Sequence, residues 1–179
     1  MSDGTFVSAD DITDEQKSSA VAVIFDEEKK LGVGLRITNG KIWCSSRSKA
    51  CNTTTYATSE DYGRENTNEI ANMEDFNEDY EAFQYCISYS APGYTSDWYL
   101  PAINELKKIY DNRKSLGYAF AILGRGFPTT DLFWSSTQSQ DRADGALMIH
   151  MRDGDIRSGG KYSGAYNGVF PVRSFNNEK

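Results

Sequence analysis

The chain has 179 residues, a formal net charge of −7 at pH 7 and 13% aromatic residues. A chain of this length removes roughly 70% of its unfolded surface from water, which is enough for one domain with its own hydrophobic core. The chain is acidic and has no run of basic residues longer than a pair, which argues against a nucleic-acid-binding protein. The aromatic content argues against a disordered chain.

The first residues, MSDGTFVSADDITDEQKSS, are polar and acidic, and they lack the basic and apolar regions of a secretion signal. We therefore expect a polar N-terminal segment over residues 1–19 and a single domain over residues 20–179. Such a start fits a cytoplasmic protein as well as a mature or excised piece of a longer one. No apolar stretch approaches the length of a membrane span, so we expect no direct membrane insertion.

The N-terminal half begins with a pattern typical of strands. The apolar runs AVAVIF (20–25) and LGVGLRI (31–37) are rich in Val and Ile and are separated by charged residues, which predicts a hairpin. An Asn39-Gly40 turn followed by KIWC (41–44) extends the pattern to a meander of three strands. Residues 45–68 are rich in Ser, Thr, Asn and charge, and we expect them to be irregular.

Two helices are predicted in the middle of the chain. Apolar residues spaced by three and four positions form one helical stripe of about four turns: Met73, Phe76, Tyr80, Phe83 and Ile87. The second helix begins near Pro101, because a proline suits the first turn, where its missing N–H is not needed. GYAFAILG (117–124) is expected to continue it as a short buried segment. The expected buried face of this helix consists of Ile103, Leu106, Ile109 and Tyr110.

The C-terminal third returns to strands, so the expected fold class is α+β. LFWSST (132–137) and ALMIHMR (146–152) are strand candidates, and a turn at Asp153-Gly154 leads to a third short strand. The next stretch, RSGGKYSGAYNG (157–168), is expected to be mostly a loop, since glycine at this density weakens regular structure. Pro171 predicts that the last apolar run is either an edge strand or an irregular one. Side chains alternate between the two faces of a strand, so in ALMIHMR we expect Leu147, Ile149 and Met151 to point inward. Met148, His150 and Arg152 are then expected to point outward.

The residues that most often carry chemistry give little support to a catalytic or metal site. His150 is the only histidine, and its alternation predicts an exposed side chain. Cys44 and Cys51 flank SSRSKA and could close a small loop, whereas Cys86 lies in a helical pattern and is expected to be buried and inert. The sequence has neither a Cys/His cluster nor a dense set of alternating oxygen ligands, so we expect no metal, no cofactor and no catalytic residue.

Four motifs occur in this order along the chain: DWYLPAINELKKIY, FWSSTQ, MRDGDI and VFPVRSF. In order and spacing they resemble the bacterial C-type-lectin-like family related to formylglycine-generating enzymes, over about residues 85–175. The resemblance implies a C-type-lectin-like α+β fold with two helices and small antiparallel sheets. It also implies that the motif residues are framework rather than catalytic residues: Trp98, Leu100, Pro101, Glu105, Leu106, Trp134, Ser135 and Ser136.

A subset of this family comprises the variable proteins of diversity-generating retroelements, in which template adenines are randomised and the resulting residues are displayed near the C-terminus. Codons of the type AAC or AAT, randomised in this way, cannot encode Lys, Glu, Gln, Met or Trp, so Gln140 and Lys161 would be fixed. The resemblance marks twelve reachable positions as candidate ligand-binding residues: Asp141, Arg142, Asp144, His150, Arg152, Asp155, Arg157, Ser158, Tyr162, Ser163, Tyr166 and Asn167. We expect them to form one exposed patch, with the Tyr, Ser, Gly and Asn composition of antibody loops.

The function expected from this resemblance is a non-enzymatic module that binds a protein or other surface ligand, on a cell surface or a phage particle. An undiversified bacterial adhesin domain of the same fold is the alternative. A third hypothesis is an enzyme of the formylglycine-generating branch. That branch uses active-site cysteines in its C-terminal part, whereas residues 87–179 of this chain contain none, so the third hypothesis is disfavoured.

Overall fold

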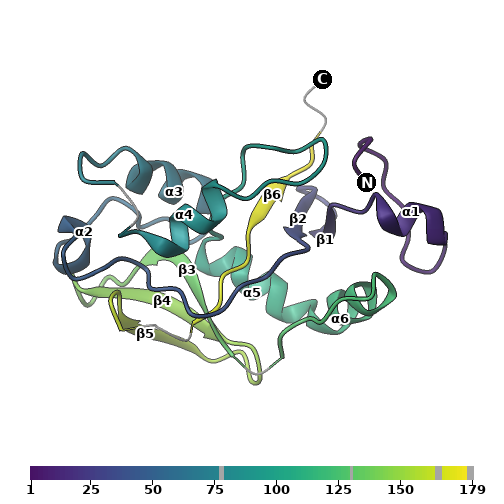
Figure 1. Ribbon diagram of the computed structural model, residues 1–179. Helices are drawn as coiled ribbons and strands as arrows, with labels where there is room; N and C mark the ends of the chain where they lie inside the picture. Colours follow the sequence, from purple (N-terminus) through teal and green to yellow (C-terminus); the bar gives the residue numbers. More distant parts are fainter. Residues whose placement is uncertain (77–78, 130, 164–166, 177–179) are drawn as a thin grey trace.

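The computed structural model describes residues 1–76, 79–129, 131–163 and 167–176. Within these residues it contains six helices and two three-stranded antiparallel sheets (Figure 1). The predicted α+β class is therefore confirmed, although there are more helices than the two that the motifs implied.

The first sheet joins the two halves of the chain. β1 (Ala22–Asp26) and β2 (Leu31–Gly34) form the predicted hairpin, and β6 (Val172–Ser174) pairs antiparallel with the other edge of β2. β6 is an edge strand, one of the two alternatives that the proline before it left open. The expected third strand at KIWC is wrong, because residues 41–44 form no strand. The backbone N–H groups of Trp43 and Cys44 donate instead to the carbonyl oxygen of Lys161, at 2.9 and 3.2 Å.

The second sheet is a meander of three consecutive strands. β3 (Leu132–Gln138), β4 (Gly145–His150) and β5 (Ile156–Gly160) pair antiparallel in that order, which leaves β5 at an edge. The predicted turn between β4 and β5 is present. Gly154 adopts a φ of +80° there, a conformation that favours glycine.

The helices of the N-terminal half differ most from the prediction. The single helix expected over residues 73–87 is wrong: α4 (Glu81–Ile87) covers only its end, and α3 (Gly63–Ala71) precedes it. α1 (Asp14–Ser18), α2 (Lys49–Asn52) and most of α3 lie where the sequence predicted polar or irregular segments. α3 is mostly polar, yet two of its polar side chains are buried in tertiary hydrogen bonds. Asn66 Nδ2 donates to Ser59 O at 2.7 Å, and Thr67 Oγ1 accepts from the Leu100 N–H at 3.2 Å.

The proline-containing motif begins α5 (Ile103–Asp111), and a break at Asn112 separates it from α6 (Arg113–Ile122). Glu105, a buried motif residue, explains the start of α5. Its Oε2 accepts from the N–H groups of Ala102 and Gly63, at 2.8 and 3.1 Å, and its Oε1 accepts from the Tyr99 hydroxyl at 3.0 Å. One carboxylate therefore begins α5 and holds the first residue of α3 against it. Burial raises the pKa of Glu105, although these three donors oppose that shift.

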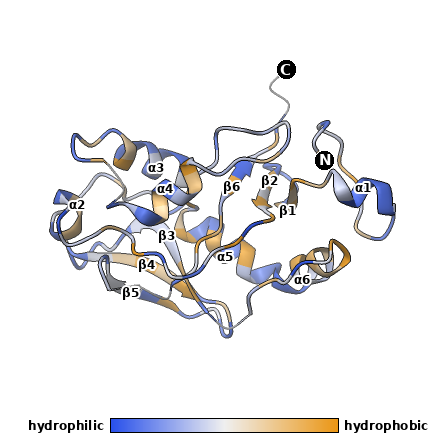
Figure 2. Cartoon of the chain, viewed as in Figure 1, coloured by the Kyte–Doolittle hydropathy of each residue, from blue (hydrophilic) through white to orange (hydrophobic). Residues whose placement is uncertain are grey.

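The β3–β4 pair is covered on both faces, and α5 contacts both sheets (Figure 1). Phe133 and Ile149 lie in a core with α5, α6 and the first sheet, whereas Trp134 and Met148 lie in a second core with Trp43 and other side chains of the α2–α4 region. The predicted outward orientation of Met148 is wrong, since this residue is 6% exposed beneath that second layer. Figure 2 shows the mainly apolar residues of β4, which agree with this coverage on both faces. In the described part of the chain, no helix is long and apolar enough to cross a membrane.

Candidate binding surface

The β4–β5 hairpin and its adjoining loops carry the positions that the sequence marked for binding. Three successive residues of the edge strand β5, Ile156, Arg157 and Ser158, are exposed. Arg157 pairs with Met148 across the strands and Ser158 with Leu147, so the two β5 side chains lie on opposite faces of the sheet.

Four candidates gather at the turn between β4 and β5: His150, Arg152, Asp155 and Arg157. Arg157 Nε donates to Asp155 Oδ2 at 2.7 Å, and Arg152 Nη2 lies 3.5 Å from Asp153 Oδ2. His150 Nδ1 lies 2.9 Å from the other oxygen of Asp153, a hydrogen bond that lowers the pKa of that carboxyl. The expected exposure of His150 is wrong, because its side chain is only 13% exposed.

A second group lies at the opposite end of the hairpin, where β4 begins and β5 ends. It consists of Asp141, Arg142, Asp144, Tyr162 and Ser163, all exposed or half-buried. The N–H of Lys161 donates to the carbonyl oxygen of Asp144 at 2.8 Å, which holds the segment after β5 beside the loop before β4. Arg142 donates through Nε and Nη2 to the Asp144 carboxylate, at 3.1 and 2.8 Å, and this contact lowers the pKa of Asp144.

The two groups lie at opposite ends of the hairpin. β4 is six residues long, which separates the ends of the hairpin by roughly 17 Å. Asn167 belongs to neither group, and its expected exposure is wrong: it is 7% exposed, and its Nδ2 lies 3.5 Å from Met148 Sδ. Tyr166 lies outside the described residues.

Lys161 supports the second group from the interior. Its side chain is 0% exposed, and the Trp43 ring centroid lies 4.8 Å from its Nζ. Burial lowers the pKa of Lys161 to about 8, a shift that interactions with Cys44, Cys51 and Asp144 oppose. The amine donates to four oxygen acceptors. These acceptors come from α2, the segment after it, the end of β3 and the loop before β4. They are Ala50 O at 2.7 Å, Thr53 O at 3.0 Å, Gln138 Oε1 at 2.9 Å and Ala143 O at 2.8 Å.

Sequence reasoning missed Tyr56, which at 87% exposed is the most exposed aromatic residue of the described chain. Thr55 donates to Gln138 Oε1 through its N–H and Oγ1, at 2.7 and 2.8 Å, and the Gln138 N–H donates to Ala57 O at 2.8 Å. Tyr56 is therefore held beside the end of β3, where the loop carrying the second group begins. Only composition could have predicted an exposed Tyr56, since TTTYATS (53–59) contains one tyrosine among small, mostly polar residues. We call this end of the molecule the loop-end surface: Tyr56, Asp141, Arg142, Asp144, Tyr162 and Ser163.

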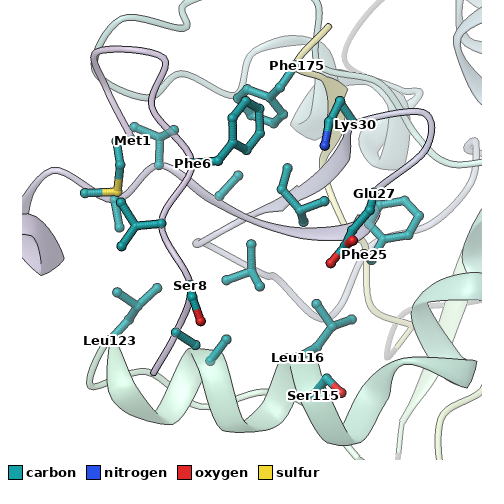
Figure 3. Close-up of a pocket in the computed structure, with 18 of the residues that line it drawn as sticks. Met1, Phe6, Ser8, Phe25, Glu27, Lys30, Ser115, Leu116, Leu123 and Phe175 are labelled. Carbon is teal, nitrogen blue, oxygen red and sulfur yellow. The ribbon is translucent and has the colours of Figure 1, made fainter. Parts of the chain in front are cut away.

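A cavity of about 870 Å³ lies away from this surface, between the N-terminal segment, β1 and α6 (Figure 3). Its lining is mainly apolar and includes Phe6, Phe25, Leu116, Leu123 and Phe175. Figure 3 shows Lys30 and Glu27 beside these apolar side chains. The sequence did not single out this cavity. Across the described ranges, no three His, Cys, Asp or Glu side chains are grouped so that they could hold a metal ion.

Together, the two small sheets, the central helix pair and the exposed hairpin define a C-type-lectin-like domain. The family model of the Lcl C-terminal domain matches residues 37–173, and the chain belongs to that family. No curated protein matches the chain. The crystal structure of a fimbrial protein from Bacteroides ovatus ATCC 8483 is similar, with a TM-score of 0.52 and 17% sequence identity. The similarity covers 79% of this chain but only 34% of the fimbrial protein, so this chain spans about a third of that protein's length.

Proposed function

We propose that this chain is a non-enzymatic ligand-binding module and that the loop-end surface makes its main contacts. The observation that carries this proposal is the combination of exposed tyrosines with a rigid support. Tyr56 and Tyr162 are 87% and 50% exposed, and the segments that carry them meet at the buried Lys161. A surface held in place before binding loses less conformational entropy when a ligand arrives.

The chemistry of the loop-end surface suits a polar ligand of low charge, such as a folded protein surface or a carbohydrate. Tyrosine supplies a large amphipathic contact area with few torsions to immobilise, and Ser163 supplies an adaptable hydrogen-bonding group. The one arginine is already paired with Asp144 in a bidentate contact, so it adds little net positive charge. A strongly anionic partner such as nucleic acid therefore finds no cationic cluster there.

The proposal of a non-enzymatic role is supported by the state of the nucleophilic residues. All three cysteines are buried, and burial raises the pKa of each thiol, which opposes formation of the reactive thiolate. His150 is paired with Asp153 in a surface turn. The formylglycine-generating hypothesis is also opposed by the lack of cysteine after Cys86.

The finer proposal is that the exposed candidate positions are diversified by a retroelement. It is supported by their residue types and by Lys161, since this unreachable residue has a structural role that requires it to stay fixed. Asn167 and His150 support this proposal less well than the other candidates, because both side chains are largely buried and a displayed residue must be exposed. Sequencing the source genome tests the finer proposal. A reverse transcriptase gene and a near-copy of the 3′ coding region, with adenines at the varied codons, are expected nearby, whereas their absence favours an undiversified surface adhesin.

A binding experiment tests the module itself. Wild type and the variants Tyr56→Ala, Tyr162→Ala and Tyr118→Ala are applied to a glycan array and to a panel of purified extracellular proteins. We expect at least one ligand of the wild type to lose about tenfold or more in affinity with Tyr56→Ala or Tyr162→Ala. Tyr118 is the matched control, because it is 54% exposed but lies on α6. Equal affinities for all four proteins, or an equal loss in the control, would contradict the proposed surface.

A further inference from the structure

The outer edge of the first sheet faces the large cavity (Figure 3). The strand order β1-β2-β6 leaves one side of β1 without a neighbouring strand. Every residue from 20 to 27 lines the cavity, whereas none of the described residues of β2 or β6 does. A cavity that follows one strand and avoids the neighbouring strands lies along the free edge of that strand.

Two residues of β1 direct their backbone groups toward this edge. The Gly34 N–H donates to the Pro171 carbonyl oxygen at 2.9 Å, so the backbone of β2 at Gly34 points away from β1. Gly34 is the cross-strand partner of Ala22, and Gly32 is the partner of Ile24. Because the direction of the backbone groups alternates along a strand, the N–H and C=O groups of Ala22 and Ile24 point outward. No backbone hydrogen bond joins either residue to a described residue outside the sheet.

The segment on the other side of the cavity does not cover this edge. Residues 4–9 form the opposite wall, and no backbone hydrogen bond in the described chain joins them to β1. The segment is held at both ends instead. The Ser2 N–H donates to Ser19 O at 2.9 Å, and the Tyr118 hydroxyl donates to Asp10 Oδ1 at 2.8 Å. The cavity therefore separates this segment from the edge of β1 and leaves room between them.

The cavity has apolar walls on both faces of β1. On one face it is lined by Ile24 and Phe175, which belong to the same small apolar cluster. On the other face it is lined by Val23 and Leu116, which pack in the core that includes α6. The side chains of a strand added at this edge would alternate between the two faces. An extended chain with apolar residues at successive positions therefore suits both the backbone groups and the walls.

We propose that the free edge of β1 binds an extended, apolar peptide segment of a partner protein, which adds to the first sheet as a fourth strand. The backbone of the peptide exchanges hydrogen bonds with Ala22 and Ile24, and its side chains enter the cavity on both faces. In this mode of recognition the main chain supplies affinity and the side-chain pockets supply specificity. The inference does not rest on the loop-end surface or on the function proposed for it.

The experiment measures the binding of a fluorescent synthetic peptide to the full chain. The peptide has alternating valine and alanine over five positions, the length of β1, with lysines at both ends for solubility. Two further peptides carry ester bonds in place of amides, one at the odd and the other at the even positions, which removes N–H donors without adding bulk. An added strand directs alternate N–H groups toward β1, so we expect at least one ester peptide to bind about tenfold or more weakly than the parent.

A proline substitution tests the same edge from the side of the protein. Ala22 is the first residue of β1, and proline there removes an outward N–H without breaking the pairing with β2. We expect Ala22→Pro to weaken binding of the parent peptide by about tenfold or more. Ile156→Pro is the matched control, because Ile156 is the first residue of the edge strand β5 of the other sheet. This variant is expected to bind the peptide as the wild type does.

Several outcomes would overturn the proposal. Equal affinities of the wild type for all three peptides would show that apolar contact alone causes binding. A parent peptide that does not bind, or an equal loss with Ile156→Pro, would exclude the β1 edge as the site. Dimerisation of the peptide-free protein that Ala22→Pro abolishes would assign the edge to a second copy of the chain. The ester peptides test the wild type directly, so the answer does not depend on the folding of a proline variant.

Discussion

A single buried ammonium organises the end of the molecule proposed for binding. Lys161 has four oxygen acceptors for its three protons, and they belong to four different segments of the chain. A buried charge is stable only when it is paired or fully hydrogen-bonded, and removing it takes a donor from the carbonyl oxygens of Ala50, Thr53 and Ala143. At the scale of the residue, Lys161 is thus a structural requirement for the exposed side chains around it.

Lys161→Met tests this role, because methionine retains much of the side-chain length but cannot donate a hydrogen bond. We expect the free energy of unfolding to fall by about 1 to 3 kcal/mol, the cost of leaving a buried carbonyl oxygen without a hydrogen-bond donor. Lys114→Met is the control on an exposed residue of α6, where a change within about 0.5 kcal/mol is expected. Denaturant unfolding of both variants measures the difference, and similar small losses would refute the structural role.

At the scale of the element, the C-terminal segment is held closely against β3. The N–H of Gly168 donates to Leu132 O at 2.7 Å, and the Trp134 N–H donates to Gly168 O at 3.0 Å. A Cβ at residue 168 would lie 2.3 Å from Phe133 Cε1, which is closer than atoms can approach. Phe133 is itself fully buried, so its ring has little room to move away. Because Gly168 has no side chain, the C-terminal segment can approach β3 this closely.

Two glycine-to-alanine substitutions distinguish the effect of close packing on stability from the effect of backbone flexibility. Gly168→Ala is expected to cost about 1 to 3 kcal/mol of stability, because the new methyl group displaces a buried ring. Gly117→Ala lies in the middle of α6, where the new Cβ meets no atom within 4 Å apart from its chain neighbours and the backbone of its own helix, and it is expected to stabilise by about 0.5 to 1 kcal/mol through helix propensity. Thermal unfolding should therefore shift in opposite directions for the two variants. A shift in the same direction would contradict the packing argument.

At the scale of the whole molecule, packing and display occupy different parts of the hairpin region. The two faces of the β3–β4 pair enter two separate cores, so the centre of this sheet is fully enclosed. The edge strand β5 and the loops at its ends remain exposed. Stability and binding should therefore respond to different substitutions.

Trp134→Ala and the double variant Tyr162→Ala/Ser163→Ala test that separation. The first should cost about 3 to 5 kcal/mol, because it leaves a cavity where a fully buried indole lay. The second should change stability by less than about 1 kcal/mol, as expected for exposed side chains. Denaturant titrations provide both values, and equal losses would place the two loop residues in the core.

Prediction from sequence worked where the signal was local. The β1–β2 hairpin followed from two Val- and Ile-rich runs, and the start of α5 followed from Pro101 and the spacing of Ile103, Leu106 and Ile109. It failed where a tertiary contact replaced a local one. The helical stripe from Met73 to Ile87 was periodic, yet only residues 81–87 are helical, and the polar α3 forms because Asn66 and Thr67 find distant partners.

The sequence by itself determined the α+β fold class and the β3–β4–β5 meander, since these depend on periodicity and turn residues. The family resemblance implied the framework role of Trp134, Ser135 and Ser136, which are buried. Only the tertiary structure decided that β6 completes the first sheet, that Tyr56 joins the loop-end surface and that Lys161 supports it. It also decided that the marked positions lie at two ends of the hairpin. The physical reason is that these features arise from contacts between residues far apart in the chain, and periodicity over a few neighbouring positions carries no information about such contacts.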